Sequence, residues 1–280
     1  MLRIITDSAS DYTLDELKQL NVEMISLNVT FGSDTFRETR DISKEQFFEK
    51  LITSDVFPIT SQPSPNDILE ILEDAKSKND EVLGIFLSSK VSGTYNTCVM
   101  MKNTVEIENC YFLDSLSGSA GEKILVNEAC KMRDAGNSLD EIVKKLESIK
   151  TRIKYLIAGD TLDYLAKGGR ISALAMRIGN LLKFKPIVSV VDGNTVLHSK
   201  PRGIKSAIEE LVLNVVNDKI DTSYPVYGIY TPSEVNIDKL IEKLADAGIR
   251  VDYKHFLGAV IGSHIGPNAF GVIYISANNV

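Results

Sequence analysis

Strand patterns and amphipathic helix patterns alternate along most of this sequence, and this alternation restricts the fold more than any other feature. Residues 2–6 are apolar like a buried strand, and Thr13 and Glu16 form a capping box for the helix that follows. The same order recurs at residues 82–87, where a strand pattern precedes a helix from about residue 94. Strands that are joined through helices pair in parallel, because the crossover returns the chain to the same end of the sheet. The sequence therefore predicts an α/β fold built on a parallel sheet.

Two domains are expected, because 280 residues exceed the usual size of a single hydrophobic core. A capped helix from Ser138 to about residue 150 ends the first alternating part. We therefore expect an N-terminal α/β domain over residues 1–150, whose parallel sheet is flanked by helices, and a C-terminal mixed α/β domain over residues 151–280. In the second part Asp192-Gly193 predicts a hairpin, and hence antiparallel pairing. One large α/β domain is the alternative.

Three segments lie outside the clear alternation. Residues 22–31 are apolar and rich in β-branched side chains, which predicts one long strand. Residues 32–41 are polar, which predicts a surface loop. Residues 262–268 contain two glycines and a proline, which predicts another loop.

The charge and the cysteines narrow the class of protein. The chain carries 31 basic and 38 acidic residues, a net charge of −7, which argues against a nucleic-acid partner. Cys98, Cys110 and Cys130 lie in apolar surroundings without a C-x-x-C spacing, so we expect buried, reduced thiols in a cytoplasmic protein. The first residues form a strand pattern too short for a signal peptide, and no apolar run approaches the roughly 18 residues of a membrane span.

Most familiar catalytic motifs are missing. No phosphate-binding G-x-x-x-x-G-K-[ST] or G-x-G-x-x-G motif is present, and the three histidines show no metal-ligand spacing, so neither a cofactor nor a metal is expected. There is also no G-x-S-x-G elbow of a serine hydrolase. We therefore expect no catalytic residues. The alternative is a serine-dependent acyl hydrolase using Ser92 and His264, with Asp114 as the third member of a triad.

Two hydroxyl-rich stretches precede two predicted helices. One follows the strand at residues 82–87 and contains Ser88, Ser89, Ser92 and Thr94. The other contains Thr60 and Ser61, which stand before the helix cap Ser64 and have no capping role of their own. Ligands of open α/β sheets bind at the carboxyl ends of strands, where Asp7-Ser8 and Asp114-Ser115 also fall. Several neutral donors of this kind suit a carboxylate head group.

The chain resembles the DegV family. The resemblance depends on stretches that occur in the family's order from residue 1 to residue 280: Thr6-Asp7-Ser8, Thr60-Ser61-Gln62-Pro63-Ser64, Ser88-Ser89-Lys90-Val91-Ser92-Gly93-Thr94-Tyr95, Tyr164-Leu165-Ala166-Lys167-Gly168-Gly169-Arg170-Ile171, Lys185-Pro186-Ile187 and His264-Ile265-Gly266-Pro267. It implies a two-domain fold of the EDD type that binds one long-chain fatty acid as its ligand. It also implies a carrier subunit that presents this acid to a separate ATP-dependent fatty acid kinase, so that acyl phosphate reaches lipid synthesis. Transient contact with a membrane is left open.

The resemblance also assigns residues. Thr60, Ser61, Ser92 and the Gly93 amide would hold the carboxylate, Arg170 and His264 would lie near the head group, and Arg202 would meet the phosphate or the kinase subunit. Asn268 stands where the family usually has glycine. The apolar helix predicted at residues 173–182 is either a wall of the acyl tunnel or part of an ordinary core.

Overall fold

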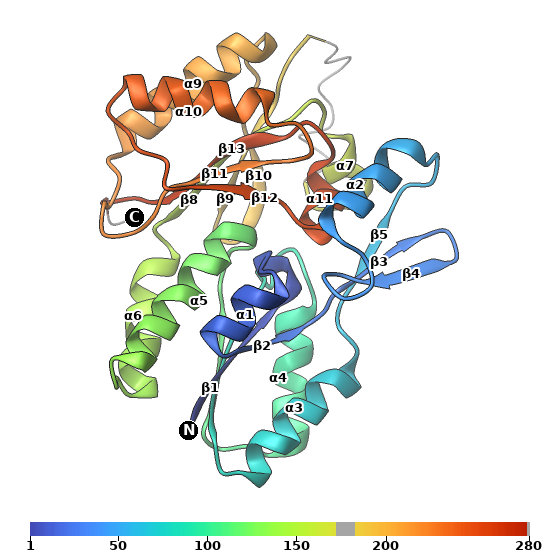
Figure 1. The fold of residues 1–280 in the computed structure, drawn as a ribbon, viewed down its shortest axis with the longest axis vertical. Coiled ribbons are helices and arrows are strands. Elements are labelled where there is room, and N and C mark those ends of the chain that lie inside the picture. The colour runs from blue at the N-terminus through green and yellow to red at the C-terminus, as the bar shows by residue number, and fades with distance from the viewer. Residues whose placement is uncertain (172–182, 279–280) are drawn as a thin grey trace.

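The computed structural model describes residues 1–171 and 183–278. The predicted α/β fold is confirmed: a parallel sheet forms in the N-terminal part of the chain and a mixed sheet in the C-terminal part (Figure 1). The parallel sheet has the strand order β2-β1-β6-β7. Its strands are β1 (Leu2–Asp7), β2 (Val22–Ile25), β6 (Glu81–Phe86) and β7 (Cys110–Asp114). Asp7 and Asp114 therefore end their strands at the same edge of the sheet, as predicted.

Helices cover both faces of the parallel sheet. Alternate strand residues point to opposite faces, so Ile4 and Ile5 belong to different hydrophobic clusters. The helices on the side of Ile4 are α1 (Leu14–Leu20), α5 (Ser119–Asp134) and α6 (Leu139–Lys150), and those on the side of Ile5 are α3 (Pro65–Ser77) and α4 (Thr94–Val105). The short 3₁₀ helix η1 (Ser8–Ser10) follows β1 directly. The predicted capping boxes form at Thr13 and Ser138.

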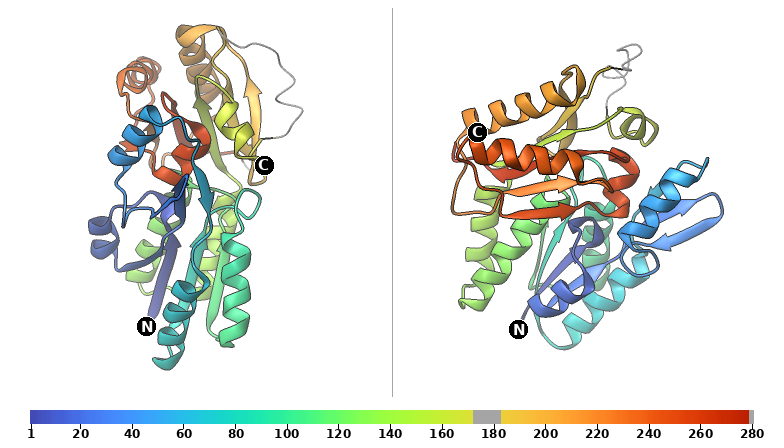
Figure 2. Two further views of the ribbon diagram at one scale, coloured as in Figure 1. Left: turned by 90° about the vertical axis from the view of Figure 1, so that its right-hand side faces the viewer. Right: turned by 45° about the horizontal axis from the view of Figure 1, so that its top comes forward.

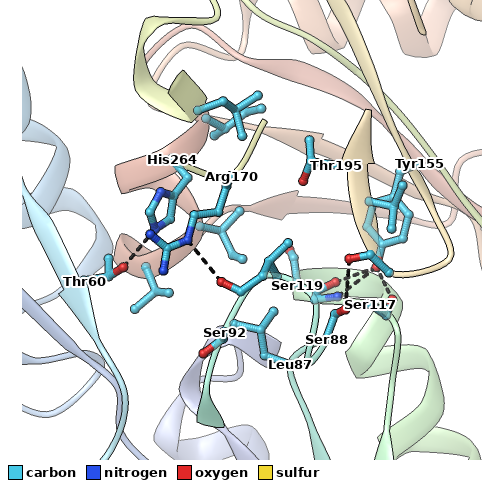
Figure 3. Close-up of a pocket in the computed structure, with 18 of the residues that line it drawn as sticks. Thr60, Leu87, Ser88, Ser92, Ser117, Ser119, Tyr155, Arg170, Thr195 and His264 are labelled. Carbon is cyan, nitrogen blue, oxygen red and sulfur yellow. Dashed lines mark hydrogen bonds between the residues drawn. The ribbon is translucent and has the colours of Figure 1, made fainter. Parts of the chain in front are cut away.

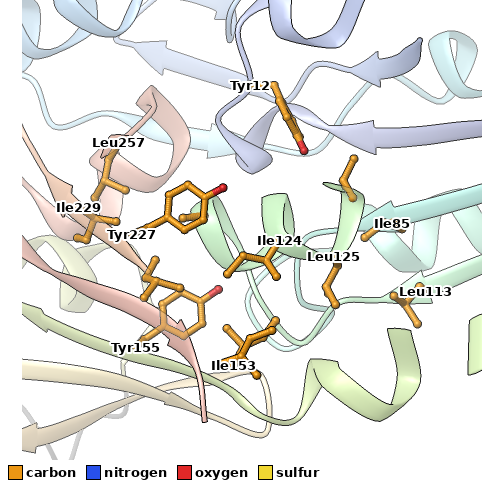
Figure 4. Packing of buried hydrophobic residues seen from close by; sticks show 14 of the residues in the cluster. Tyr12, Ile85, Leu113, Ile124, Leu125, Ile153, Tyr155, Tyr227, Ile229 and Leu257 are labelled. Atoms are coloured by element: carbon orange, nitrogen blue, oxygen red, sulfur yellow. The ribbon is translucent and has the colours of Figure 1, made fainter. Parts of the chain in front are cut away.

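The mixed sheet has the order β10-β9-β8-β13-β11-β12 and is antiparallel except between β11 and β12. Its strands are β8 (Ile153–Ala158), β9 (Ile187–Val191), β10 (Asn194–Ser199), β11 (Tyr227–Tyr230), β12 (Tyr253–Phe256) and β13 (Phe270–Ile275). Helices α9 (Gly203–Asp218) and α10 (Val235–Asp246) pack on its outer face (Figure 2). Its inner face shares one continuous hydrophobic cluster with α5 and α6, where Tyr155 and Tyr227 meet Ile124 (Figure 4). This cluster joins the two halves of the chain.

A third, small sheet was not predicted. It has the order β4-β3-β5 and is antiparallel, with strands β3 (Asn28–Phe31), β4 (Asp34–Arg37) and β5 (Ile59–Ser61). The prediction of one strand over residues 22–31 was wrong, because the chain leaves the parallel sheet after β2 and enters this sheet at β3. The predicted loop at residues 32–41 contains β4, whose polar composition reflects an exposed edge strand. Thr60 likewise lies on an edge strand rather than in a loop.

Two short helices complete the fold near the small sheet. They are α7 (Asp163–Lys167) and α11 (Ala259–Ile265), and α2 (Lys44–Thr53) packs beside α11. The prediction of a loop at residues 262–268 was therefore wrong in its first half. Most of α11 is buried, so the segment lacks the polar face that reveals an amphipathic helix, and its glycine, Gly262, packs against the rings of Phe47 and Phe48.

Candidate functional site

A cavity of about 380 Å³ lies where the parallel sheet's carboxyl edge, the small sheet and the inner face of the mixed sheet meet (Figure 3). This volume is within the range of small-molecule sites in proteins. Its walls are largely aliphatic and come from all parts of the fold. The aliphatic residues that line it are Leu27, Leu87, Val91, Ile157, Leu165, Val188, Val190, Leu257, Val260, Ile261, Ile265 and Ile273.

Polar side chains gather at one end of this cavity. Thr60 and Ser61 reach it from β5, and Ser92 and Gly93 from the loop before α4. Arg170, which follows α7, and His264 on α11 line the same end (Figure 3). The fold thus brings both hydroxyl-rich stretches onto one cavity, although about 30 positions separate them in the sequence.

The contact between Thr60 and His264 indicates which ring nitrogen of His264 carries the proton. Thr60 Oγ1 lies 2.8 Å from His264 Nε2, while His264 Nδ1 is buried and has no hydrogen-bond partner among the described residues. A buried N–H without an acceptor costs more than a bare lone pair, so we assign the proton to Nε2, which donates to Thr60. Burial, reinforced by the positive charge of Arg170, lowers the pKa of His264 to about 4. The imidazole is therefore neutral, and the Thr60 hydroxyl is left free to donate into the cavity.

Arg170 links the two sides of the cavity entrance. Its Nε donates to the carbonyl oxygen of Val91 at 3.1 Å, and its guanidinium also donates to the carbonyl oxygen of Gly168. The side chain is half-buried. These bonds leave other guanidinium N–H groups available, so Arg170 can still pair with an anion at the polar end.

Ser92 and Gly93 stand at the start of α4. Ser92 Oγ lies 2.9 Å from Thr94 Oγ1 and accepts a bond from the Thr94 N–H at 3.2 Å. Gly93 occupies the capping position and has no side chain to cap the helix, so Ser92 is the residue that accepts a bond from the Thr94 N–H. Gln62 was not singled out from the sequence. It lines the same end, and its Oε1 accepts a bond from Thr97 at 3.0 Å.

The opposite end of the cavity is closed by Tyr155, which sequence reasoning also missed. The Tyr155 hydroxyl donates to the carbonyl oxygen of Gly118 at 2.7 Å and accepts from the Gly118 N–H at 3.1 Å, and Ser117 Oγ contacts it as well (Figure 3). Ser88 donates to the Gly193 carbonyl oxygen at 2.9 Å beside it. These polar groups satisfy one another, and the packed core lies behind them (Figure 4). Nothing in the strand pattern of β8 distinguishes Tyr155 from an ordinary core residue.

Two predicted features lie elsewhere. Arg202 precedes α9, has an exposed side chain, and is not among the described residues that line the cavity. Its predicted contact with a phosphate or a kinase stays a prediction. The helix predicted at residues 173–182 lies outside the described residues. Asn268 adopts a left-handed backbone, with φ of 65°, which asparagine tolerates better than most residues.

The hydrolase alternative requires contacts that the described residues do not make. Ser92 bonds to Thr94, and His264 bonds to Thr60 rather than to Ser92. Asp114 accepts bonds from the backbone N–H groups of Ser89 and Leu116, and the nitrogen of His264 that a triad would orient has no carboxylate partner. A histidine whose pKa is lowered to about 4 is also a weak general base near neutral pH.

Neither a metal-ligand cluster nor a membrane-spanning helix occurs in the described part of the chain. Within residues 1–171 and 183–278, no three His, Cys, Asp or Glu side chains are grouped so that they could hold a metal ion. None of the helices described is both long and apolar enough to cross a bilayer. The three cysteines are free and buried, as predicted.

The fold and the cavity define a three-sheet α/β protein with an aliphatic pocket that is polar at its entrance. The sequence model described as "Uncharacterised protein, DegV family" matches residues 1–277. A DegV domain-containing protein of Clostridium acetobutylicum is 34% identical over 100% of this chain and 99% of its own. The chain belongs to the DegV family.

Solved structures agree with this membership. A fatty acid binding DegV family protein from Streptococcus agalactiae superposes with a TM-score of 0.90 at 28% identity, covering 100% of this chain and 99% of its own. A DegV family protein from Thermus thermophilus, solved for its fatty acid binding, gives a TM-score of 0.88 at 28% identity, with coverage of 98% and 99%.

Proposed function

We propose that this protein binds one long-chain fatty acid, with the acyl chain in the aliphatic cavity and the carboxylate at its polar end. The observation that carries the proposal is that one cavity combines aliphatic walls with a cluster of hydroxyl donors beside Arg170 at one end. Solved DegV proteins that bind fatty acids support it. In this proposal Thr60, Ser61, Ser92 and the Gly93 amide donate to the carboxylate, and the neutral His264 orients Thr60.

The acyl chain and the carboxylate contribute different amounts of binding free energy. Burial of about fourteen methylenes at about 0.8 kcal/mol each contributes on the order of 11 kcal/mol before ordering costs. One charge-assisted hydrogen bond at the head group contributes roughly 1.5 to 3 kcal/mol. The acyl chain therefore sets the affinity, and the polar end sets the orientation that leaves the carboxylate at the entrance.

We further propose that the protein is a carrier without a reaction of its own. It would present the carboxylate to a separate ATP-dependent fatty acid kinase in the cytoplasm, and the acyl phosphate would enter lipid synthesis. Two features support this proposal: the sequence has no nucleotide-binding motif, and the hydroxyl donors lie at the entrance, where a second protein can reach the carboxylate. Arg202 would face that partner from outside the cavity.

Native mass spectrometry of the protein, purified without detergent, tests the first proposal. We expect an added mass equal to one fatty acid, which organic extraction removes and added palmitic acid restores. A protein that stays free of ligand after incubation with palmitic acid contradicts the proposal.

The carrier role is tested with a purified fatty acid kinase, ATP and the loaded protein. The double variant Thr60→Ala, Ser92→Ala should bind palmitic acid at least about tenfold less tightly, a modest loss beside the acyl-chain contribution, and should lose most of the kinase-dependent phosphorylation. Phosphorylation at the wild-type rate would refute these two assignments.

A further inference from the structure

Helix α11 begins in a buried place without a capping side chain of its own. Gly258 holds the capping position, and Ala259 and Val260 are buried. The N–H groups at the start of a helix need acceptors where water is excluded. Two carboxylates from the N-terminal part of the chain provide them: Asp11 Oδ1 accepts from the Gly258 N–H at 2.9 Å, and Glu38 Oε1 accepts from the Val260 N–H at 2.8 Å.

Glu38 is itself held in place on two sides. Its side chain is buried, and its second oxygen accepts a bond from Ser8 Oγ at 2.7 Å. Ser8 Oγ in turn accepts from the Leu27 N–H at 3.0 Å, while the Glu38 N–H donates to the Leu27 carbonyl oxygen at 2.9 Å. The carboxylate therefore has one fixed place from which to hold α11. Ser8 belongs to the Thr6-Asp7-Ser8 stretch, which does not line the cavity.

The small sheet consequently contacts α11 at both ends. Glu38 directly follows β4 and binds the first turn of the helix, whereas Thr60 on β5 binds His264 in the last turn. Val260 and His264 are four residues apart, which is about one turn and about 6 Å along the helix axis. A shift of the helix start would therefore move the imidazole relative to Thr60.

We propose that Glu38 is a positioning residue for the polar end of the cavity. By accepting the Val260 N–H it fixes α11, and through α11 it holds the His264 imidazole against Thr60. The proposal rests on the proposed binding of a fatty acid at this end. It also accounts for Gly258, where a Cβ atom would overlap Asp11 Oδ1 and Glu38 Oε1.

Charged groups from several elements surround Glu38. Asp11 follows η1, Lys44 lies on α2 with its ammonium donating to the Asp11 and Phe256 carbonyl oxygens at 3.0 and 2.8 Å, and His255 on β12 lies 3.4 Å from Asp11. Burial and the charge of Asp11 raise the pKa of Glu38 to about 8. Because a carboxylic acid and a carboxylate both keep an acceptor oxygen for the Val260 N–H, the positioning role holds in either state.

A double-mutant cycle tests the proposal. Palmitic acid is titrated into the delipidated full-length protein carrying Glu38→Ala or Glu38→Gln, each with His264 intact and with His264→Ala. With His264 present, Glu38→Ala should weaken binding about tenfold, the size of one charge-assisted hydrogen bond. With His264→Ala it should weaken binding less than about twofold, because Glu38 acts through the histidine. Glu38→Gln retains an acceptor for Val260 and should restore binding to within about twofold of the wild type.

The imidazole gives a second readout that needs no ligand. Nitrogen NMR of His264 should show Nε2–H in the wild type and in Glu38→Gln, and a pKa that rises toward its ordinary value in Glu38→Ala. Equal losses of affinity with and without His264, or an unchanged His264 signal in Glu38→Ala, would overturn the inference.

If Glu38→Ala does not fold, Gly258→Ala displaces the start of α11 in the same way and is judged by the same two readouts. A wild-type protein that binds no palmitic acid refutes the proposed function alone, since the His264 signals still decide the positioning role.

Discussion

The Thr60 hydroxyl and the His264 imidazole lie 2.8 Å apart, from Oγ1 to Nε2, although 204 positions separate them in the sequence. The contact joins an edge strand of the small sheet to α11. It fixes which hydrogen each group offers, because an imidazole that donates to Thr60 leaves the threonine O–H for a ligand. Two segments, β5 and α11, therefore form this part of the polar end, and the local sequence pattern of neither segment indicates that they meet.

Removal of the Thr60 hydroxyl should weaken fatty-acid binding. Thr60→Val keeps the shape of the side chain and deletes the donor, so we expect palmitic acid to bind about tenfold less tightly, as for one charge-assisted bond. Thr60→Ser retains the hydroxyl and serves as the matched control, with affinity within about twofold of the wild type. Calorimetric titration measures both. Wild-type affinity in Thr60→Val would show that this hydroxyl does not contact the ligand.

Acid should destabilise the protein through His264. Its pKa in the folded state, about 4, is below the ordinary 6.5, so the unfolded chain takes up this proton first as the pH falls. The contribution of His264 is thus fully present above about pH 6.5 and is lost progressively down to about pH 4. We expect the free energy of unfolding, measured with urea, to fall more steeply over this window in the wild type than in His264→Gln. Parallel curves for the two proteins would contradict the assignment of a neutral, buried imidazole.

The guanidinium of Arg170 should strengthen fatty-acid binding both through its positive charge and through the hydrogen bonds that hold it in place. Arg170→Gln removes the cation near the proposed carboxylate and should weaken palmitic acid binding and reduce its dependence on salt concentration. Arg170→Lys keeps the charge but cannot reproduce the bonds to the Val91 and Gly168 carbonyl oxygens, so an intermediate affinity is expected. Titrations at low and high salt separate the two effects. Equal affinity in all three proteins would exclude Arg170 from the head-group site.

The closed end of the cavity should tolerate no extra atom at Gly121. A Cβ atom there would overlap the Tyr155 hydroxyl and Ser117 Oγ, whereas a Cβ atom at Gly159 has only the Thr161 carbonyl oxygen within contact, at 3.7 Å. Gly121→Ala should lower the free energy of unfolding by about 1 to 3 kcal/mol, a typical cost of overpacking, and Gly159→Ala should change it little. Urea denaturation of the two variants tests this. Equal stabilities would mean that Tyr155 is free to move aside.

The local chemistry of the sequence predicted much of the fold. The capping residues Thr13 and Ser138 mark helix starts because their hydroxyls accept bonds from N–H groups only three residues away. The hairpin at Asp192-Gly193 is equally local, and β9 and β10 pair across it. The predicted cap at Ser64 also forms, and its side chain accepts a bond from the Asn66 N–H. Such features need only neighbouring residues, so a single sequence reveals them.

By itself, the sequence determined the α/β class, the order of most elements, and the two hydroxyl-rich stretches that meet at the cavity. Only the tertiary structure decided that residues 22–31 divide between two sheets, that Thr60 lies on an edge strand, and that Glu38, Thr60 and His264 are connected through α11. The physical reason is distance along the chain. The passage of the chain between two sheets, the carboxylates that cap α11 and the cavity walls all depend on distant partners. The cap on Gly258 comes from Asp11, 247 residues away, and the cap on Val260 comes from Glu38, 222 residues away. A local pattern of hydrophobicity or turn residues does not identify such partners.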